Sequence, residues 1–297
     1  MQEIEIQVRS ATLEDQARIL ALLDQARRQY KAFGLEDLPS LLEDPAHVFV
    51  LADTGSELWG IACVTVRPRP AAPGEGERTN WGYLRGLALT NGWRAEVGVW
   101  TLMEGLRVGL QERQVHYLAA YAIRPWMIAP LMRAGLRVVD HIVTYERTRQ
   151  DLPKASLPPH VHIRPARPDD VSRLTTLDSA AFSPLWRLAS GEMIELLVTS
   201  GRFVVAERAS EPIGYACSDV RESLGYIHRI AVHPDAQGQG IGRALLADAL
   251  LYCQTSGAIL ITLNTQYSNA RADRLYRRFG FHPTPQRIPV MVGTIAT

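Results

Sequence analysis

Three glycines at alternating positions, Gly238, Gly240 and Gly242, separate a β-rich apolar run from an apolar stretch typical of a helix. Glycine has no Cβ, so the backbone of such a loop can approach a ligand closely and adopt positive φ. The start of the following helix adds unpaired N–H donors and partial positive charge. This order of strand, loop and helix predicts a site for a phosphate group. The alternative is a glycine-rich turn that binds nothing.

Two common phosphate-binding loops do not fit these residues. A dinucleotide-binding fingerprint needs a third glycine at position 243 and an acidic residue near position 262. The chain has Arg243 at the first place and no acidic residue at the second. A P-loop needs the sequence Gly-Lys-Ser/Thr, which is absent.

The segment 259–281 continues the pattern with an apolar strand, a polar break, a helix and a stop at Gly280. With these two motifs, the region from about 160 to 285 resembles the GCN5-related N-acetyltransferase (GNAT) superfamily. The family's acetyl-CoA loop, Arg/Gln-x-x-Gly-x-Gly/Ala, is matched by Gln237, Gly240 and Gly242. Its downstream signature is matched by Asn269, Ala272, Leu275-Tyr276 and Gly280-Phe281.

The resemblance implies an N-acetyltransferase that uses acetyl-CoA as co-substrate and lets a primary amine attack the thioester directly. The pyrophosphate would be held by the N–H groups of Gln237, Gly238, Gln239, Gly240, Ile241, Gly242 and Arg243. The strand Ile230, Ala231 and Val232 would pair with the pantetheine arm, and an N–H near Val232 would polarise the thioester. Asn269 would bind the arm near its cysteamine end. Tyr276 would protonate the departing thiolate, and core packing is the alternative role for this side chain.

The attacking amine is charged at neutral pH and must first lose a proton. Family members often carry an acidic residue at the place of His228, and an imidazole with a pKa of about 6.5 is a suitable base. A histidine that is simply hydrogen-bonded on a half-buried strand is an equally supported alternative. Glu222 is a second candidate base. His233, in the His-Pro pair at the strand end, is interpreted as structural.

The acceptor is less well defined. A small-molecule amine is the first hypothesis, because the branch of the family that acetylates protein N-termini usually has Glu at the place of Asn264. The alternatives are a protein or peptide N-terminal acetyltransferase, and a non-catalytic acyl-CoA sensor or interaction protein. An inactive first copy joined to an active second one resembles the organisation of the mycothiol synthase family. Trp93 and Trp100 could line an acceptor pocket or belong to the core.

The first half of the chain is a diverged copy of the second. GIACVTVR at 60–67 aligns with GYACSDVR at 214–221, and Arg9 and Asp15 align with Arg164 and Asp170. Similarity over a domain length indicates duplication. We therefore expect an α/β class with mixed α+β sheets, built as two tandem GNAT folds. The predicted boundaries are 1–148 for a degenerate domain, 149–160 for a linker and 161–297 for the acetyltransferase domain.

The two copies differ where chemistry is expected. The first copy has an insertion within PRPAAPGEGERTNW at 68–81, and Val97 and Val99 stand in place of Gly240 and Gly242. β-Branched side chains there should block the close approach of a pyrophosphate. Later in the chain, Leu131 replaces Tyr276, and Pro125 and Pro130 interrupt the matching helix. The first half is expected to keep the fold without the reaction.

Composition supports two ordinary domains without unusual partners. The 297 residues are 46% hydrophobic with a net charge of +1, and no basic stripe suggests nucleic acid. No apolar run is long enough to span a membrane, and the N-terminus lacks the core of a signal peptide. Cys63, Cys217 and Cys253 lack metal-ligand spacing, so buried thiols in a cytoplasmic protein are expected. A homodimer stays open.

In the second domain the hydrophobic pattern predicts an alternation of strands and helices that ends in two strands. The expected strands are 161–165, 202–208, 212–221, 225–233 and 259–263. The expected helices are 168–182, 190–200, 240–255 and 268–278.

Overall fold

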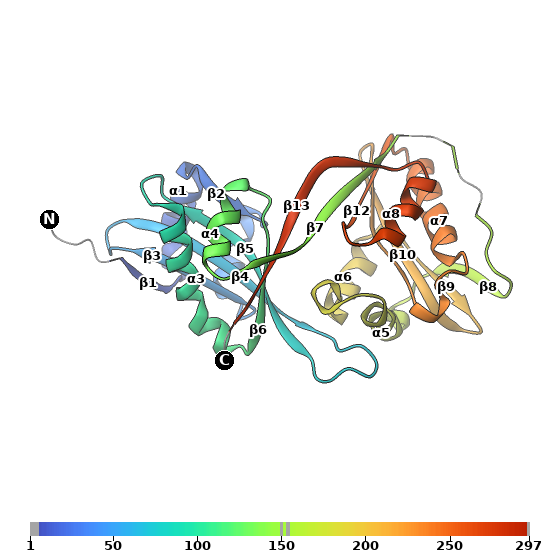
Figure 1. Cartoon of the computed structure of the whole chain (residues 1–297), viewed down its shortest axis with the longest axis horizontal. Coiled ribbons are helices and arrows are strands. Elements are labelled where there is room, and N and C mark those ends of the chain that lie inside the picture. The colour runs from blue at the N-terminus through green and yellow to red at the C-terminus, as the bar shows by residue number, and fades with distance from the viewer. Residues whose placement is uncertain (1–5, 149–150, 153–154, 296–297) are drawn as a thin grey trace. The chain divides into compact units, whose positions relative to one another are not determined.

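The structure is a computed structural model that describes residues 6–148, 151–152 and 155–295. Within these residues the chain forms two compact units. Unit 1 comprises residues 6–68, 79–140 and 288–295, and unit 2 comprises 69–78 and 141–287. Each unit is a mixed sheet with helices packed on it (Figure 1). The predicted α/β class, built twice, is confirmed.

Unit 1 contains a sheet in the order β1-β3-β4-β5-β6-β13, with β2 paired to β5. The β5–β6 pair is parallel, and β1–β3, β3–β4 and β2–β5 are antiparallel. Its strands are β1 (Gln7–Ser10), β2 (Arg28–Lys31), β3 (His47–Asp53), β4 (Leu58–Arg69), β5 (Thr79–Leu89) and β6 (Val115–Tyr121). Its helices are α1 (Gln16–Gln25), α2 (Leu38–Glu43), α3 (Ala95–Glu112) and α4 (Ile128–Arg133).

Unit 2 repeats this plan in the order β8-β9-β10-β11-β12-β7, with a parallel β11–β12 pair. Its strands are β8 (Val161–Pro165), β9 (Arg202–Arg208), β10 (Glu211–Arg221), β11 (Leu224–Val232) and β12 (Leu260–Gln266). Its helices are α5 (Val171–Ala181), α6 (Ser190–Thr199), α7 (Ile241–Thr255) and α8 (Ala270–Arg278). Apart from the end of the chain, these elements agree with the prediction to within three residues.

The last strand of each sheet comes from the other half of the chain. Residues 142–147 of β7 (Arg137–Arg147) pair antiparallel with β12 of unit 2. Residues 290–294 of β13 (His282–Thr294) pair antiparallel with β6 of unit 1. The prediction that two strands follow α8 is therefore wrong, because the structure has a single strand of 13 residues there, β13.

This exchange also makes the two units more interleaved than the predicted boundaries 1–148 and 161–297. Residues 141–148 and 69–78 belong to unit 2, and 288–295 belong to unit 1. The predicted linker, 149–160, contains neither helix nor strand where the structure describes it. Its residues 149–150 and 153–154 lie outside the described residues.

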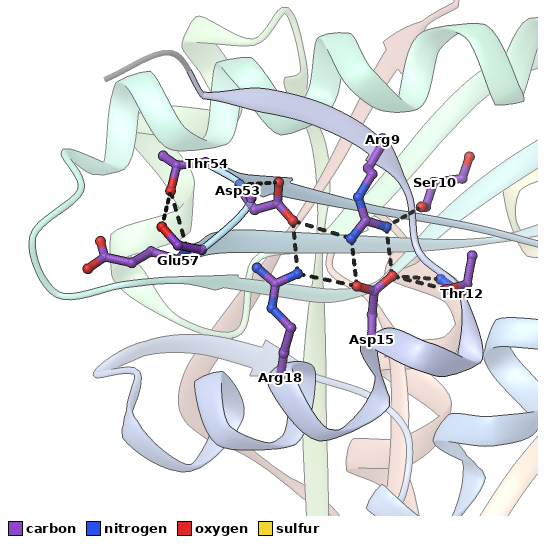
Figure 2. A network of polar contacts seen from close by, with 10 residues as sticks. Arg9, Ser10, Thr12, Asp15, Arg18, Asp53, Thr54 and Glu57 are labelled. Atoms are coloured by element: carbon purple, nitrogen blue, oxygen red, sulfur yellow. Dashed lines mark hydrogen bonds and ion pairs between the residues drawn. The ribbon is translucent and has the colours of Figure 1, made fainter. Parts of the chain in front are cut away.

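The duplication is visible as the same ion-pair network in both units. Figure 2 shows Arg9, whose two Nη atoms donate to the carboxylate of Asp15 at 2.7 Å, with Asp53 3.3 Å away. In unit 2, Arg164 donates to Asp170 at 2.7 and 2.9 Å and to Glu207. Arg9 lowers the pKa of Asp15 to about 2. The contact that both units share joins the first strand of each unit to the start of its first helix.

Both units bury their cores on two faces of the sheet. Cys63 and Cys217 hold the same register place, opposite Phe49 and Phe203, and all three cysteines are buried as predicted. Trp93 packs in the unit 1 core, whereas Trp100 is exposed on α3. Over the described residues, no helix has the length and apolarity to span a membrane.

Candidate functional site

A cavity of about 600 Å³ opens in unit 2 beside β11, and its lining joins most of the residues that the sequence singled out. The glycine loop that follows β11 forms one wall, and the end of β12 with α8 forms another. Ala181 and Phe182, at the end of α5, complete it. Trp93 and Trp100 are not among the lining residues.

The cavity exists because β11 and β12 separate. The two strands pair in parallel from Leu224–Leu260 as far as Ile227–Leu263. Beyond this point β11 continues along β10 and β12 continues along β7, and no further β11–β12 pair occurs in the described chain. The inner edge of β11 is therefore left open from residue 228 onward.

The open edge presents two backbone donors. The N–H of His233 bonds to the carbonyl of Ile213 on the β10 side at 2.9 Å. Because successive residues of a strand point their N–H groups to opposite sides, those of Ile230 and Val232 face the open edge. They are available to an extended ligand that adds to β11 as a strand.

His228 occupies a β-bulge in β11. Cys217 pairs with Arg229 and Ser218 pairs with Ile227, which leaves His228 as the extra residue. Bulges are common next to active sites, where they redirect a side chain. The imidazole is exposed, lines the cavity and stacks on Tyr226 at 6.2 Å between ring centroids. Partial desolvation lowers its pKa below the ordinary 6.5, so it is largely neutral at pH 7.

The glycine loop has the geometry of an anion site. Gly238 and Gly240 adopt φ of +80° and +90°, and α7 begins directly after Gly240. Within the described residues, no acceptor bonds to the backbone N–H groups of positions 238–242. Five consecutive free donors at a helix start favour an oxyanion.

Side chains around the loop form hydrogen bonds that hold its shape. Gln237 donates to the carbonyl of Val232 at 3.0 Å and accepts a hydrogen bond from Arg271. Gln239 bonds to Arg208 and to the carbonyl of Asp235, and Ile241 is buried in the core. Gln239 and Ile241 do not line the cavity, so only their backbone N–H groups could serve a ligand.

Helix α8 brings an amide and several arginines to the cavity. Asn269 caps the helix, accepting a hydrogen bond from the N–H of Ala272 at 3.1 Å, so its amide nitrogen is left to donate. Arg271, Arg274 and Arg278 of α8 line the cavity, together with Arg243 of α7. Their positive charge suits a ligand that carries several phosphates.

The position of Tyr276 is compatible with both predicted roles, proton donor to the thiolate and core packing. The ring is 8% exposed and packs against Tyr145 and Phe281, with centroids 5.6 and 6.0 Å away. The residue also lines the cavity, and no hydrogen bond to its hydroxyl occurs in the described structure. Burial raises the pKa of Tyr276 to about 12, which keeps the phenol protonated at neutral pH. Tyr145, from the exchanged strand β7, bonds to Asp273 at 2.5 Å.

Sequence reasoning missed Arg229, which lines the cavity beside His228. It forms a two-point ion pair with the fully buried Asp178 at 2.7 and 2.9 Å. It also donates to the carbonyl of Trp186 at 2.6 Å and lies 3.8 Å from the centre of the Phe182 ring. Trp186 and Asp178 lie 43 and 51 positions away in the chain, so no local motif marks Arg229.

Two further residues considered in the sequence analysis, Glu222 and His233, lie elsewhere. Glu222 is in the β10–β11 turn with φ of +55°, outside the cavity lining. His233 accepts a hydrogen bond from the N–H of Asp235 at 3.4 Å, which fits the structural role expected of it. Of the two candidate bases, only His228 faces the cavity.

In unit 1 the corresponding place is filled. Strand β2 pairs with β5 through Tyr30–Leu87 and Arg28–Leu89, and Leu87 and Leu89 align with Ile230 and Val232. In addition, α3 already begins at Ala95, so a helix replaces the glycine loop. We predicted that two valine side chains block the binding of a pyrophosphate in unit 1. This prediction is corrected, because α3 and β2 close the edge of β5. Val97 is exposed and Val99 lies in the core.

Known proteins resemble this chain in sequence and in fold. Residues 171–281 match the family described as Acetyltransferase (GNAT) family. The mycothiol acetyltransferase of Pseudarthrobacter chlorophenolicus is 31% identical over 160 residues, 49% of each chain. That of Actinosynnema mirum is 28% identical over 249 residues, 80% of this chain and 75% of its own. The chain spans about half the length of most curated relatives that it matches.

A solved tandem GNAT protein from the clavulanic acid biosynthesis pathway, without AcCoA, matches with a TM-score of 0.62. The identity is 14%, and the match covers 99% of both chains. At this identity the likeness concerns the fold alone, which is the tandem GNAT fold expected from the sequence.

Proposed function

Residues 171–281 of this chain belong to the acetyltransferase (GNAT) family, and from this premise we propose that unit 2 transfers an acetyl group from acetyl-CoA to the primary amine of a small molecule. The observation that carries the proposal is the open edge of β11 next to five free N–H groups of the glycine loop. An extended arm that ends in a pyrophosphate fits this combination.

The order of donors along β11 suggests how acetyl-CoA lies. The pyrophosphate is held at positions 238–242, so the N–H of Val232 is the first strand donor that the arm meets. The N–H of Ile230 is two residues further from the loop, about 7 Å along the strand. We therefore assign the thioester carbonyl to Ile230 rather than to the neighbourhood of Val232, and the pantetheine amides to Val232 and Asn269.

The reaction then needs three proton transfers. His228 takes a proton from the ammonium form of the acceptor, and the free amine attacks the thioester carbon. The N–H of Ile230 stabilises the oxyanion that develops on the carbonyl oxygen. When the C–S bond breaks, the hydroxyl of Tyr276 gives its proton to the thiolate. The nitrogen of the new amide loses its remaining extra proton to solvent, and solvent returns a proton to the phenolate. A pKa of about 12 keeps that hydroxyl protonated until the thiolate forms.

Two observations support a small-molecule acceptor. The curated relatives described above are mycothiol acetyltransferases, and the chain has Asn264 at the cavity where N-terminal acetyltransferases usually have Glu. Asn264 accepts a hydrogen bond from Thr144 of β7 at 2.7 Å, so this part of the wall is neutral. A non-catalytic acyl-CoA sensor is the alternative, and Tyr276 in the cavity favours the enzyme.

Titration calorimetry of acetyl-CoA against the intact chain tests the site. Gly240→Val places a β-branched residue at φ of +90° and narrows the loop, so binding should weaken about 100-fold or more. Gly257→Val is the matched control, since Gly257 has φ of +88° at the far end of α7. Wild-type protein that does not bind acetyl-CoA, or equal losses in both variants, would contradict the proposal.

A further inference from the structure

We propose that the segment 69–78, which the first half of the chain contributes to unit 2, positions the acceptor wall of the cavity. This inference rests on the proposed function and names what sets the shape of the acceptor end. The segment is the insertion that distinguishes the first copy from the second. It belongs to the compact unit that contains the cavity, although its own strands, β4 and β5, belong to the other sheet.

The first anchor is Arg187, which is 4% exposed. Its guanidinium forms a two-point ion pair with Glu75, with 2.8 Å between Nη2 and Oε1. It also donates to the carbonyl of Pro70 at 3.1 Å. Its Nε donates to the carbonyl of Phe182 at 3.0 Å. One buried cation therefore joins two places of the insertion to the end of α5.

The second anchor is the ion pair between Arg69 and Glu192, in which the Arg69 side chain is 5% exposed. Glu192 also accepts a hydrogen bond from the N–H of Ala189 at 2.9 Å and so caps α6. The insertion is thus attached at both ends of the connection between α5 and α6.

That connection reaches the cavity where it leaves α5. Ala181 and Phe182 line the cavity, and the Phe182 ring lies over Arg229. The only regular structure in this connection is a 3-10 helix of three residues, Pro184–Trp186. A segment with so little backbone bonding of its own depends on side-chain anchors for its shape. Asp178 and Arg229 anchor the segment to α5 and β11, and the insertion anchors it through Arg187.

The Arg187 anchor is separate from the cofactor end. Arg187 bonds to Phe182, Pro70 and Glu75, and none of these residues lies in the glycine loop. Loosening this anchor should therefore change the acceptor wall and leave acetyl-CoA binding intact. This gives the first copy a role in the reaction although its own edge is closed.

Hydrogen exchange on the full-length protein tests this inference. In Glu75→Ala the buried guanidinium loses its carboxylate, so amides of 182–190 should exchange about fivefold faster or more. Glu77→Ala is the matched control, because Glu77 is an exposed acid of the same insertion that forms no hydrogen bond or ion pair with the described residues. Arg69→Gln should loosen the start of α6 in the same way. Unchanged exchange at 182–190 in both Glu75→Ala and Arg69→Gln overturns the inference.

Two binding measurements separate this inference from the proposed function. Acetyl-CoA affinity should stay within about twofold of wild type in Glu75→Ala, since the glycine loop is untouched. The KM for the best substrate among cysteamine, ethanolamine, glucosamine and L-alaninamide should rise, with the KM for acetyl-CoA unchanged. A parallel loss of acetyl-CoA affinity would overturn the positioning role. Wild-type protein that binds no acetyl-CoA would defeat the proposed function, while the exchange data would still report on the anchors.

Discussion

Leu87 and Ile230 hold equivalent places in the two halves of the chain, but Leu87 pairs with Tyr30 of β2, whereas no strand among the described residues pairs with Ile230 on that side. The N–H of Ala32 bonds to the carbonyl of Arg85 at 2.8 Å, so the alternation of the ladder directs Leu87 toward β2. The backbone groups of Ile230 and its neighbours in unit 2 could therefore receive a pantetheine arm. The corresponding backbone groups of unit 1 already pair with β2.

The first prediction follows from this difference. Calorimetry should find about one acetyl-CoA per chain, and Val97→Gly with Val99→Gly should not add a second. The glycines would restore the sequence of the loop, but α3 would still occupy its place and β2 would still cover the edge. A second site in the double variant would show that the two side chains alone had blocked it.

Tyr276→Phe tests the general acid. The ring and its packing remain, so acetyl-CoA affinity should not change, whereas kcat should fall by about 100-fold or more because the thiolate leaves unprotonated. Tyr252→Phe is the control, since Tyr252 is a partly buried tyrosine that packs against the same core cluster. Steady-state rates that stay the same in Tyr276→Phe would leave Tyr276 with a packing role only.

Local motifs were sufficient to predict residues that the structure brings together at the cavity. Gln237, Gly240 and Gly242 lie within six residues, and Asn269 and Tyr276 lie on one short helix, so each motif is contiguous. Glycine at a positive φ and a cap at a helix start are local requirements of the backbone. The sequence therefore shows them directly.

The acceptor end could not be predicted in this way. Arg229 acquires its role from Asp178, 51 positions away, and Arg187 from Glu75, 112 positions away. The exchange of β7 and β13 could not be predicted for a similar reason, because a sequence pattern predicts a strand but not the strands that it pairs with. The two copies also differ at β2, because the equivalent positions 183–186 fall in a 3-10 helix and its cap.

The pH dependence of kcat/KM tests His228 as base. Desolvation lowers the pKa of His228 below 6.5, and a base must be neutral to act. Activity should therefore be constant at neutral pH and fall as the pH drops below this pKa. His228→Gln should remove that acidic limb and reduce the rate about 10²-fold or more. His282→Gln, a change at an exposed histidine away from the cavity, should leave the profile intact. An acidic limb that persists in His228→Gln would assign the base to another group.

The stability of unit 1 should depend on pH through Asp15, which is 4% exposed. Its pKa is lowered to about 2 in the folded chain, against 3.8 ordinarily, so folding favours the ionised carboxylate. This contribution, about 2 kcal/mol, is complete well above pH 3.8 and is lost as the pH falls toward 2. Asp15→Asn should therefore lower the thermal midpoint at pH 7 but differ little from wild type near pH 2. Glu14→Gln, at the exposed neighbouring residue, should have little effect at either pH, and a constant deficit of Asp15→Asn across this range would show that the ion pair with Arg9 does not carry the effect.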